Sequence, residues 1–514
     1  MVSPNTSLFA CRSCRRDFVQ ALKSLSTPRY PRRRTFTRPS NAPKPQPDIR
    51  HIRQNPGLYE QNCVDRNYAA QARNSWRIIE LFDVWQKCQS SARQLRERNN
   101  VVKKSVAKPQ EGDAARQALI EEARRLKAEL GEIEQKEEEL QDNIQVLALE
   151  LPNLSSVHTP TGLTPEVLSY INVRTNSSGP SRSQLSHTDI GARLNLLDFS
   201  AAATTSGWGW YYLLNGAALL EQALVQYALH TCMQRGWRIV SPPSMVYAHM
   251  ASACGFQPRD QHGETQIYAI EQSEKDKQKS EEGQSRPQYV MAGTAEIPLA
   301  GLKANTVLAE EELPLKVVGV SRSYRAEAGA RGVDTKGLYR VHEFTKVEMF
   351  AWTLPDTQDA DGQGNFATGT QQNSHSERLF QEMVELQKSI LQPLGLHCRV
   401  LSMPSTDLGA SATRKIDIEA FFPSRIEKDD GYGEVTSASI CTDYQSRRLN
   451  TRMKSKAQGG KLEYVHTLNG TAMAIPRVLA AILENGWDEE KQEVRVPEVL
   501  RKWMGGMDAI RKDT

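Results

Sequence analysis

Apolar residues recur every three or four positions along two neighbouring stretches of the chain. The two series are Ile78, Leu81, Trp85, Cys88, Ala92, Leu95, Asn99, Val102, Val106 and Leu119, Ala123, Leu126, Leu130, Ile133, Glu137, Leu140, Ile144, Leu147, Leu151. Such a repeat keeps one stripe of each helix facing a partner helix. Turn-forming residues at 108–112 separate the series. The pattern predicts an antiparallel coiled-coil hairpin, each arm reaching roughly 50 Å at ~1.5 Å per residue.

Charge is distributed unevenly over this hairpin. Residues 87–127 hold eleven basic and five acidic side chains, whereas residues 128–150 hold one basic and eight acidic ones. A basic arm can contact phosphates far from the body of a protein. A solvated coiled-coil surface or a protein-interaction arm explains the same charge equally well, so charge alone leaves the partner open.

The pattern changes after the hairpin, and helical and alternating segments follow one another. Pro160, Gly162 and Pro165, with a Ser-, Gly- and Pro-rich stretch at 175–183, indicate a domain boundary. Beyond it we predict a helix over 211–235, a strand over 237–240, a β-hairpin over 321–350, and an apolar helix that ends near Asn485. The fold class is therefore α+β.

The β-hairpin carries charged side chains on a face that should be buried. Arg325 and Glu327 share one face by the period of two, and His342, Phe344, Lys346 and Glu348 share a face of the returning strand. Buried unpaired charges are costly, so a purely structural role would need a satisfied ion network. A phosphate-bearing substrate with an aromatic base fits better, because Arg325 would clamp phosphate and Phe344 would offer a stacking surface.

Two further segments carry candidate chemistry. In an extended backbone Thr294 and Glu296 would point to the same side and could receive an ammonium and a hydroxyl, although a plain surface strand explains them too. Arg477 begins an apolar helix and is either ion-paired or turned toward a ligand. With Phe344 it could enclose a base by a cation–π contact.

Composition narrows the class of protein. The chain of 514 residues is 39% hydrophobic and 25% charged, which excludes a wholly disordered chain and is long enough for two or three domains. The chain has no run of ~18 consecutive apolar residues, so we expect no membrane-spanning helix. Eight scattered cysteines suggest free thiols in a reducing compartment, and Cys11 and Cys14 lack the second pair that a zinc finger needs.

The first 47 residues differ from the rest of the chain. They hold ten basic residues and one acid, Asp17, with frequent Ser and Thr and no apolar run for a secretory signal. This composition is typical of a mitochondrial or plastid transit peptide, cleaved before Asp48. A disordered arm that binds nucleic acid is the alternative.

In this order, the motifs resemble the class II aminoacyl-tRNA synthetases, and among them the seryl-tRNA synthetase family of mitochondrial type. The resemblance runs from about Asp48 to the end of the chain. It rests on residues 48–56, 98–99, 151–154, 187–221 and 466–470, and most strongly on the Arg-x-Glu, Gly-rich loop and His-x-Phe-x-x-x-Glu series of 325–348.

The resemblance implies a role for each matching residue. Serine would be bound by Thr294, Glu296, Arg325, Glu348 and Thr471. ATP would be bound by Arg325, Glu327, Val341, Phe344, Glu434, Val435, Thr436, Ser437 and Arg477, with Arg325, Glu434 and Arg477 as catalytic residues. Glu434 and Ser437 would bind Mg²⁺. The basic side chains that would contact serine tRNA are Arg93, Arg96, Lys103, Lys104, Arg124 and Arg125.

The resemblance also implies an organisation. Residues 1–47 would be the transit peptide, 48–155 a tRNA-binding coiled-coil arm, and 156–514 a catalytic domain with a central antiparallel sheet flanked by helices. The protein would be a homodimer, formed through about residues 211–245. It would charge serine tRNA in the mitochondrial matrix, without attachment to a membrane. The alternatives are a catalytically inactive paralogue that binds mitochondrial tRNA or protein, and a structural coiled-coil protein.

Three departures from the family pattern stand out. Ala295 replaces a frequent Ser, Ile440 replaces an Asn, and Pro476 stands where glycine is common. Ile440 puts one polar contact in doubt, whereas proline is tolerated in the first turn of a helix. Two polar inserts, 271–288 and 356–374, are expected to be surface loops.

Overall fold

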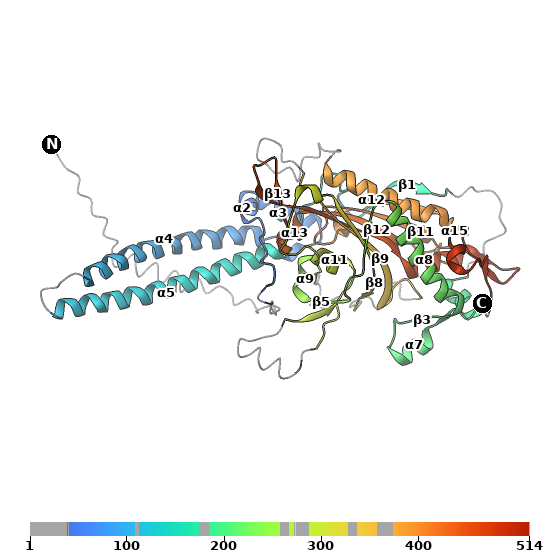
Figure 1. Ribbon diagram of the computed structural model, residues 1–514, viewed down its shortest axis with the longest axis horizontal. Helices are drawn as coiled ribbons and strands as arrows, with labels where there is room; N and C mark the ends of the chain where they lie inside the picture. The colour runs from blue at the N-terminus through green and yellow to red at the C-terminus, as the bar shows by residue number, and fades with distance from the viewer. Residues whose placement is uncertain are drawn as a thin grey trace. The chain divides into compact units, whose positions relative to one another are not determined.

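The computed structural model describes residues 39, 41–107, 113–173, 185–256, 267–271, 273, 287–326, 337–356 and 374–512 (Figure 1). The proposed leader, the hairpin turn at 108–112, Glu327, and most of both inserts lie outside these residues. Six cysteines fall within them, all buried and all unpaired, as the sequence suggests. None of the described helices combines the length and the apolar character that crossing a membrane requires.

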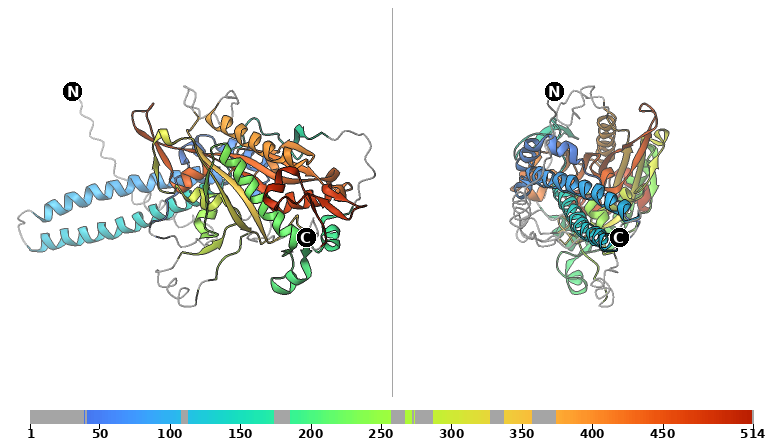
Figure 2. Two further views of the ribbon diagram at one scale, coloured as in Figure 1. Left: turned by 45° about the vertical axis from the view of Figure 1, so that its right-hand side comes forward. Right: turned by 90° about the vertical axis from the view of Figure 1, so that its left-hand side faces the viewer.

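The two heptad series form the predicted pair of long helices. They are α4 (Asn74–Val106) and α5 (Asp113–Glu150), preceded by the short helices α2 (Ile49–Gln54) and α3 (Pro56–Asp65). The two long helices lie side by side in both views of Figure 2. Ile78, Ala92 and Leu126, all members of the predicted stripes, are fully or almost fully buried between them. The coiled-coil hairpin is thus confirmed.

An eight-stranded sheet forms the centre of the second region within the described residues (Figure 1). Its strands, in spatial order, are β1 (Glu166–Ile171), β10 (Cys398–Ser402), β11 (Arg414–Phe421), β12 (Tyr432–Thr442), β15 (His466–Ala474), β9 (Glu343–Thr353), β8 (Leu315–Tyr324) and β4 (Arg238–Val240). Neighbouring strands are antiparallel except β4 and β8, which run parallel. The predicted central antiparallel sheet is confirmed.

Helices cover both faces of this sheet. One core joins the sheet to α6 (His187–Arg193), α8 (Asn215–Gln234), α12 (His375–Leu391), α14 (Ile475–Gly486) and α15 (Glu498–Arg501). A second core joins the opposite face to α9 (Ala248–Ala253), α11 (Glu296–Gly301) and α13 (Tyr444–Leu449). The remaining short elements are α7 (Phe199–Thr205), β2 (Leu197–Asp198), β3 (Tyr212–Leu213), β5 (Met245–Tyr247), β6 (Tyr289–Met291), β7 (Val307–Leu308), β13 (Arg452–Ser455), β14 (Lys461–Tyr464), β16 (Trp487–Asp488), β17 (Glu493–Arg495) and β18 (Ala509–Ile510).

Strand β9 shows how the period of two creates a polar site in the sheet. Val347, Met349 and Ala351 enter the first core, whereas Phe350 and Trp352 enter the second. Phe344, Lys346 and Glu348 continue the second face toward the start of the strand. Half of that face is therefore apolar and covered by helices, and the other half presents a ring, an ammonium and a carboxylate.

Two local expectations are wrong. Thr294 and Glu296 do not lie on an extended strand, because the chain turns after β6 and α11 begins at Glu296. Both side chains are nevertheless buried rather than on the surface. His342 lies before β9 rather than in it, and its ring stacks beside Trp210 and forms a hydrogen bond with the backbone oxygen of Arg325.

Candidate functional site

Six of the residues predicted to bind nucleotide line one recess of about 560 Å³ on the polar half of the sheet face. They are Arg325, Val341, Phe344, Glu434, Ser437 and Arg477. We call this hollow the sheet recess. The end of β8, the start of β9, β12 and the first turn of α14 meet there, which is why residues up to 152 positions apart along the chain, from 325 to 477, share one cavity.

Arg477 is held firmly in the wall of the sheet recess. Its Nη1 donates to the backbone oxygen of Glu434 at 2.9 Å and to Oε2 of the same residue at 3.1 Å, and its Nε donates to the backbone oxygen of Tyr339 at 3.2 Å. Across the recess the guanidinium carbon of Arg325 lies 5.3 Å from the centre of the Phe344 ring. Two guanidinium groups and one aromatic face therefore border the cavity.

The carboxyl of Glu434 is kept ionised by neighbouring cations. Burial alone would raise the pKa of Glu434, but Arg477, Lys415 and Arg325 outweigh it and hold that pKa well below its ordinary value. On the next strand Lys415 donates to Asp417 at 2.7 Å, and burial raises the pKa of the Asp417 carboxyl. The carboxylate of Glu434 on β12 therefore lies next to the buried Lys415–Asp417 pair on β11.

A second set of polar side chains lies beside the sheet recess and deeper in the fold. Nζ of Lys346 and Oε2 of Glu348 are 2.7 Å apart, and both side chains are almost fully buried. The hydroxyl of Thr471 donates to the same carboxylate at 3.3 Å. Lys346 and Thr471 also line the sheet recess, so this cluster communicates with it.

Glu296 and Thr294 complete the deeper set. Gln445 donates from Nε2 to Oε1 of Glu296 at 2.6 Å, and the backbone N–H of Glu296 donates to Oγ1 of Thr294 at 3.3 Å. Burial raises the pKa of Glu296, while Lys346, Asn469 and Gln445 act to lower it. Two buried carboxylates, Glu296 and Glu348, with the hydroxyls of Thr294 and Thr471 form a buried group of polar side chains, which we call the polar chamber. Its chemistry suits a small cation that carries a hydroxyl.

Other predicted site residues have different positions. Val435 lies in the first core, and Thr436 is buried with its hydroxyl donating to the backbone oxygen of Thr471, so neither side chain lines the sheet recess. Glu327 lies outside the described residues. Ile440 packs in the first core, which replaces a polar contact by apolar burial. Pro476 lies in the first turn of α14, where a missing N–H costs nothing.

A buried histidine supports one edge of the sheet recess. His187 contacts Glu484 through Nδ1 at 2.8 Å, and its Nε2 accepts a hydrogen bond from the backbone N–H of Leu338 at 3.0 Å. Leu338 begins the segment that leads to Val341 and lines the recess. The neutral ring with its proton on Nδ1 satisfies both contacts, so His187 fixes this wall.

The six predicted tRNA-contacting side chains are all exposed on the arm, but they differ in their partners. Arg96 forms two hydrogen bonds to Glu134 on the opposite helix, and Arg93 pairs with Glu97 on its own helix at 3.1 Å. Lys103, Lys104, Arg124 and Arg125 form no ion pair with any residue in the described part of the chain. These four, which we call the distal cations, are therefore available to an anionic partner.

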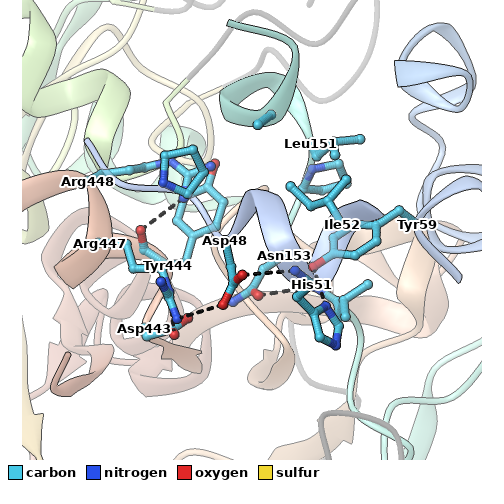
Figure 3. Close-up of a pocket in the computed structure, with 14 residues that line it drawn as sticks. Asp48, His51, Ile52, Tyr59, Leu151, Asn153, Asp443, Tyr444, Arg447 and Arg448 are labelled. Atoms are coloured by element: carbon cyan, nitrogen blue, oxygen red, sulfur yellow. Dashed lines mark hydrogen bonds and ion pairs between the residues drawn. The ribbon is translucent and has the colours of Figure 1, made fainter. Parts of the chain in front are cut away.

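The base of the arm is fixed to the region of the eight-stranded sheet by polar contacts (Figure 3). Arg447 on α13 donates to Asp443 at 2.6 Å and to Asp48 at 3.2 Å, and Arg448 donates to the backbone oxygen of Leu149 at 3.3 Å. Asp48, Arg447 and Arg448 border a recess of about 550 Å³ between the arm base and α13. Since these charges are satisfied by protein partners, the recess has a structural explanation.

The predictions missed several residues of the site. Lys346 shares the predicted face but received no role, and Lys415, Asp417, Gln445 and His187 were not candidates at all. Lys415 and Asp417 did leave a signal, because they alternate with the apolar residues Ile416 and Ile418 in a buried strand. Gln445 left none, since a glutamine in a short polar helix is usually exposed.

Comparison with known families agrees with both halves of the chain. Residues 48–155 match the family described as “Seryl-tRNA synthetase N-terminal domain”. Residues 278–486 match the family described as “tRNA synthetase class II core domain (G, H, P, S and T)”.

Similar proteins extend over nearly the whole chain. The mitochondrial serine–tRNA ligase of Saccharomyces cerevisiae is 40% identical over 480 residues, covering 91% of this chain and 96% of that protein. The mitochondrial serine–tRNA ligase of Schizosaccharomyces pombe is 36% identical over 88% of this chain and 87% of that protein. A crystal structure of seryl-tRNA synthetase from Pyrococcus horikoshii complexed with ATP superposes with a TM-score of 0.76 at 30% identity, covering 91% of this chain and all of that one.

Proposed function

The chain belongs to the seryl-tRNA synthetase family, and on that basis we propose how its residues divide the work of the reaction. It is an ATP-dependent serine–tRNA ligase, which activates L-serine as seryl-adenylate and transfers serine to the 3′ end of serine tRNA. The observation that carries the assignment of roles is the sheet recess with the polar chamber directly beside it.

ATP occupies the sheet recess. Phe344 and Arg477 enclose the adenine, Val341 offers a backbone contact, and Arg325 binds the α-phosphate. The three residues other than Val341 present one aromatic face and two guanidinium groups to the same cavity. Guanidinium groups bind phosphate with two parallel hydrogen bonds and stack on rings, so both contacts suit these side chains. Glu327, Val435 and Thr436 stay predictions as ATP contacts.

Serine occupies the polar chamber. Thr294 and Glu296 hold the ammonium of serine. Glu348 and Thr471 lie on the side of the pocket that receives the serine side chain, and Arg325 contacts the serine carboxylate. Support comes from the contacts of the two buried carboxylates: Glu348 pairs with Lys346 and accepts from the Thr471 hydroxyl, and Glu296 accepts from Gln445. A chamber with this many polar groups rejects alanine, because the loss of the substrate hydroxyl leaves them unpaired.

Mg²⁺ is the cofactor that fits the remaining donors. This ion prefers hard oxygen ligands and usually takes one or two carboxylates together with substrate phosphates. Glu434 is held in its ionised form, Ser437 lines the sheet recess, and Oδ1 of Asp417, paired in register with Ser437, is buried without a hydrogen-bond partner in the described residues. Glu434 and Ser437 would hold the ion, which would neutralise charge on the phosphate oxygens.

The reaction proceeds by positioning rather than by a protein nucleophile. The serine carboxylate attacks the α-phosphorus of ATP, and the bond to the β-phosphate oxygen breaks as pyrophosphate leaves. Arg325 stabilises the negative charge that spreads over the α-phosphate oxygens in the transition state. A 3′-terminal hydroxyl of the tRNA then attacks the carbonyl carbon of seryl-adenylate, and AMP leaves.

The arm is the tRNA-binding part of the chain. Residues 48–155 form this arm and residues 156–514 the catalytic domain, with the distal cations at the far end of α4 and the facing part of α5. Four exposed cations with no ion-pair partner among the described residues form a phosphate-binding surface.

The protein acts in mitochondria, in the matrix, after removal of a leader within residues 1–47. The basic, acid-poor composition of these residues and the mitochondrial relatives of two yeasts support this proposal. Import of the full chain into isolated mitochondria, with and without a membrane potential, tests it.

The protein is a homodimer, formed through residues 211–245. Leu219, Met233, Ile239 and Met245 of this region are each about 40–50% exposed despite their apolar side chains. Clustered exposed apolar groups are typical of association surfaces. Sedimentation of the purified chain at several concentrations distinguishes dimer from monomer.

Serine-dependent ATP–pyrophosphate exchange tests the proposed function. The full chain should support exchange with serine and not with threonine or alanine. Charging of serine tRNA should then require the arm as well. Absence of exchange in a folded protein that still binds ATP would favour the inactive paralogue. The argument against that alternative is that the chain retains Arg325, Glu348, Glu434 and Arg477.

A further inference from the structure

One side chain outside the predicted site controls the geometry of Glu296. Gln445 on α13 is completely buried and donates from Nε2 to Oε1 of Glu296 at 2.6 Å. On its other side, Oε1 of Gln445 accepts a hydrogen bond from the hydroxyl of Thr467 at 2.7 Å. Three elements, α11, α13 and β15, are thus joined by one buried chain of hydrogen bonds.

This chain of hydrogen bonds has a direction. The hydroxyl of Thr467 carries one proton and has two acceptors within reach, Oε1 of Gln445 at 2.7 Å and the backbone oxygen of Thr442 at 3.3 Å, and it donates to the nearer one, Oε1. A reversed amide would place Oε1 of Gln445 against the carboxylate of Glu296, which sets two acceptors together without a proton. The carboxylate of Glu296 therefore selects the orientation in which Nε2 faces it, and Oε1 then accepts from Thr467.

Several other groups surround Glu296, but Gln445 is the residue of α13 that donates a hydrogen bond to its carboxylate. Asn469 on β15 also hydrogen-bonds to the carboxylate, and Lys346 and Arg325 face it as cations. The buried thiols of Cys254 and Cys441 lie close enough to interact with it. Each of these groups acts on the charge of Glu296, but the contact with Gln445 fixes one particular carboxylate oxygen.

We propose that Gln445, anchored by Thr467, is a positioning residue for serine: it holds the carboxylate of Glu296 in the rotation that receives the ammonium of the substrate. This inference rests on the proposed role of Glu296. A carboxylate with one oxygen already bound presents the other to the substrate, so the ordering is complete before serine enters. Gln445 touches neither serine nor ATP.

The test is serine-dependent pyrophosphate exchange by full-length variants over a range of pH. Gln445→Met keeps length and volume but removes both hydrogen bonds, so KM for serine should rise roughly tenfold or more while KM for ATP stays within about twofold. Removing a donor to the ionised carboxyl raises the pKa of Glu296 further. The acid limb of kcat/KM for serine should therefore move to higher pH.

Two variants of Thr467 cover the case in which Gln445→Met does not fold. Thr467→Val preserves the side-chain shape and should reproduce both changes to a smaller extent, and Thr467→Ser should restore the normal KM and pH profile. A structural role alone would lower thermal stability without moving the acid limb. An unchanged serine KM and acid limb in folded Gln445→Met or Thr467→Val would overturn the proposal.

Glu296→Gln separates this proposal from the assignment beneath it. If Glu296 receives the ammonium, this variant should raise the serine KM and lose the acid limb. If it leaves serine KM unchanged, Glu296 is not a serine ligand and both assignments fail. If Glu296→Gln is impaired but folded Gln445→Met is normal, only the positioning role fails.

Discussion

Lys346 and Glu348 stand two residues apart on β9, and their ammonium and carboxylate are in contact at 2.7 Å in the interior of the protein. This is the satisfied ion network that a charged buried face requires. The same two groups border the place proposed for serine. The pair thus stabilises the fold and also presents polar groups to a substrate.

Removal of one partner of this pair should be costly. Lys346→Met leaves the Glu348 carboxylate buried without its cation, which should lower the free energy of unfolding by about 3 kcal/mol in urea denaturation. The double variant Lys346→Met/Glu348→Gln should recover most of that stability, because no buried charge remains. Equal midpoints for Lys346→Met and the unmodified chain would show that the ion pair does not stabilise the fold.

Arg325 should separate activation from tRNA binding. Arg325→Ala removes the guanidinium that we propose as the ligand of the α-phosphate, so serine-dependent pyrophosphate exchange should fall at least ~100-fold. Affinity for tRNA, measured by filter binding, should remain, because the distal cations lie on the arm. Normal exchange by this variant would refute the role of Arg325.

The distal cations should dominate binding of tRNA by the arm. Replacing Lys103, Lys104, Arg124 and Arg125 by alanine should weaken tRNA binding and reduce the slope of log K against log salt concentration by about one for each phosphate that the arm no longer binds. Pyrophosphate exchange should not change. A control that exchanges Lys for Arg and Arg for Lys at the four positions keeps the charge and should bind normally. If the alanine variant binds as well as this control, tRNA does not contact this surface.

His187 should affect ATP through Leu338. His187→Phe removes the acceptor for the backbone N–H of Leu338, so this wall of the sheet recess loses a constraint and KM for ATP should rise about threefold to tenfold. Ser424→Ala provides the matched control: the Ser424 hydroxyl donates to Glu484 at 2.9 Å but does not touch Leu338. Similar ATP KM values for both variants would argue against the specific support by His187.

The pH dependence should follow Glu296. Burial raises the pKa of this carboxyl above its ordinary value of 4.5, although Lys346, Asn469 and Gln445 oppose the rise. Protonation removes the charge that holds the serine ammonium, so kcat/KM for serine should decrease as pH falls through this raised pKa. KM for ATP should stay level over the same range, because the pKa of Glu434 is held low. A serine profile that is flat down to about pH 5 would contradict the assignment.

Periodic patterns predicted the architecture well. The heptads around Ile78 and Leu126 gave both long helices. The alternation predicted within 321–350 gave the strand that carries Phe344 and Glu348, although His342, which was expected in this strand, lies before it. Such patterns report which residues share a face, and burial then follows. They fail where the chain turns sharply, as at Thr294, since a period of two has no meaning once α11 begins.

The site was only partly predictable for a related reason. Local spacing placed Phe344 beside Lys346, the start of an apolar helix pointed to Arg477, and the family resemblance added Glu434. Neither reveals a contact such as that between Gln445 and Glu296, which lie 149 residues apart in the sequence. Support of this kind depends on how distant elements pack, and a single sequence contains no local signal of it.

Helix α13 has only six residues, yet it faces two ways. Gln445 points inward to Glu296, while Arg447 reaches Asp48 and Arg448 reaches Leu149 at the foot of the arm. A deletion of one residue here would rotate the helix by about 100°. The contact proposed to position serine and the contacts that hold the foot of the arm would then be lost together, so one short helix couples the two ends of the molecule.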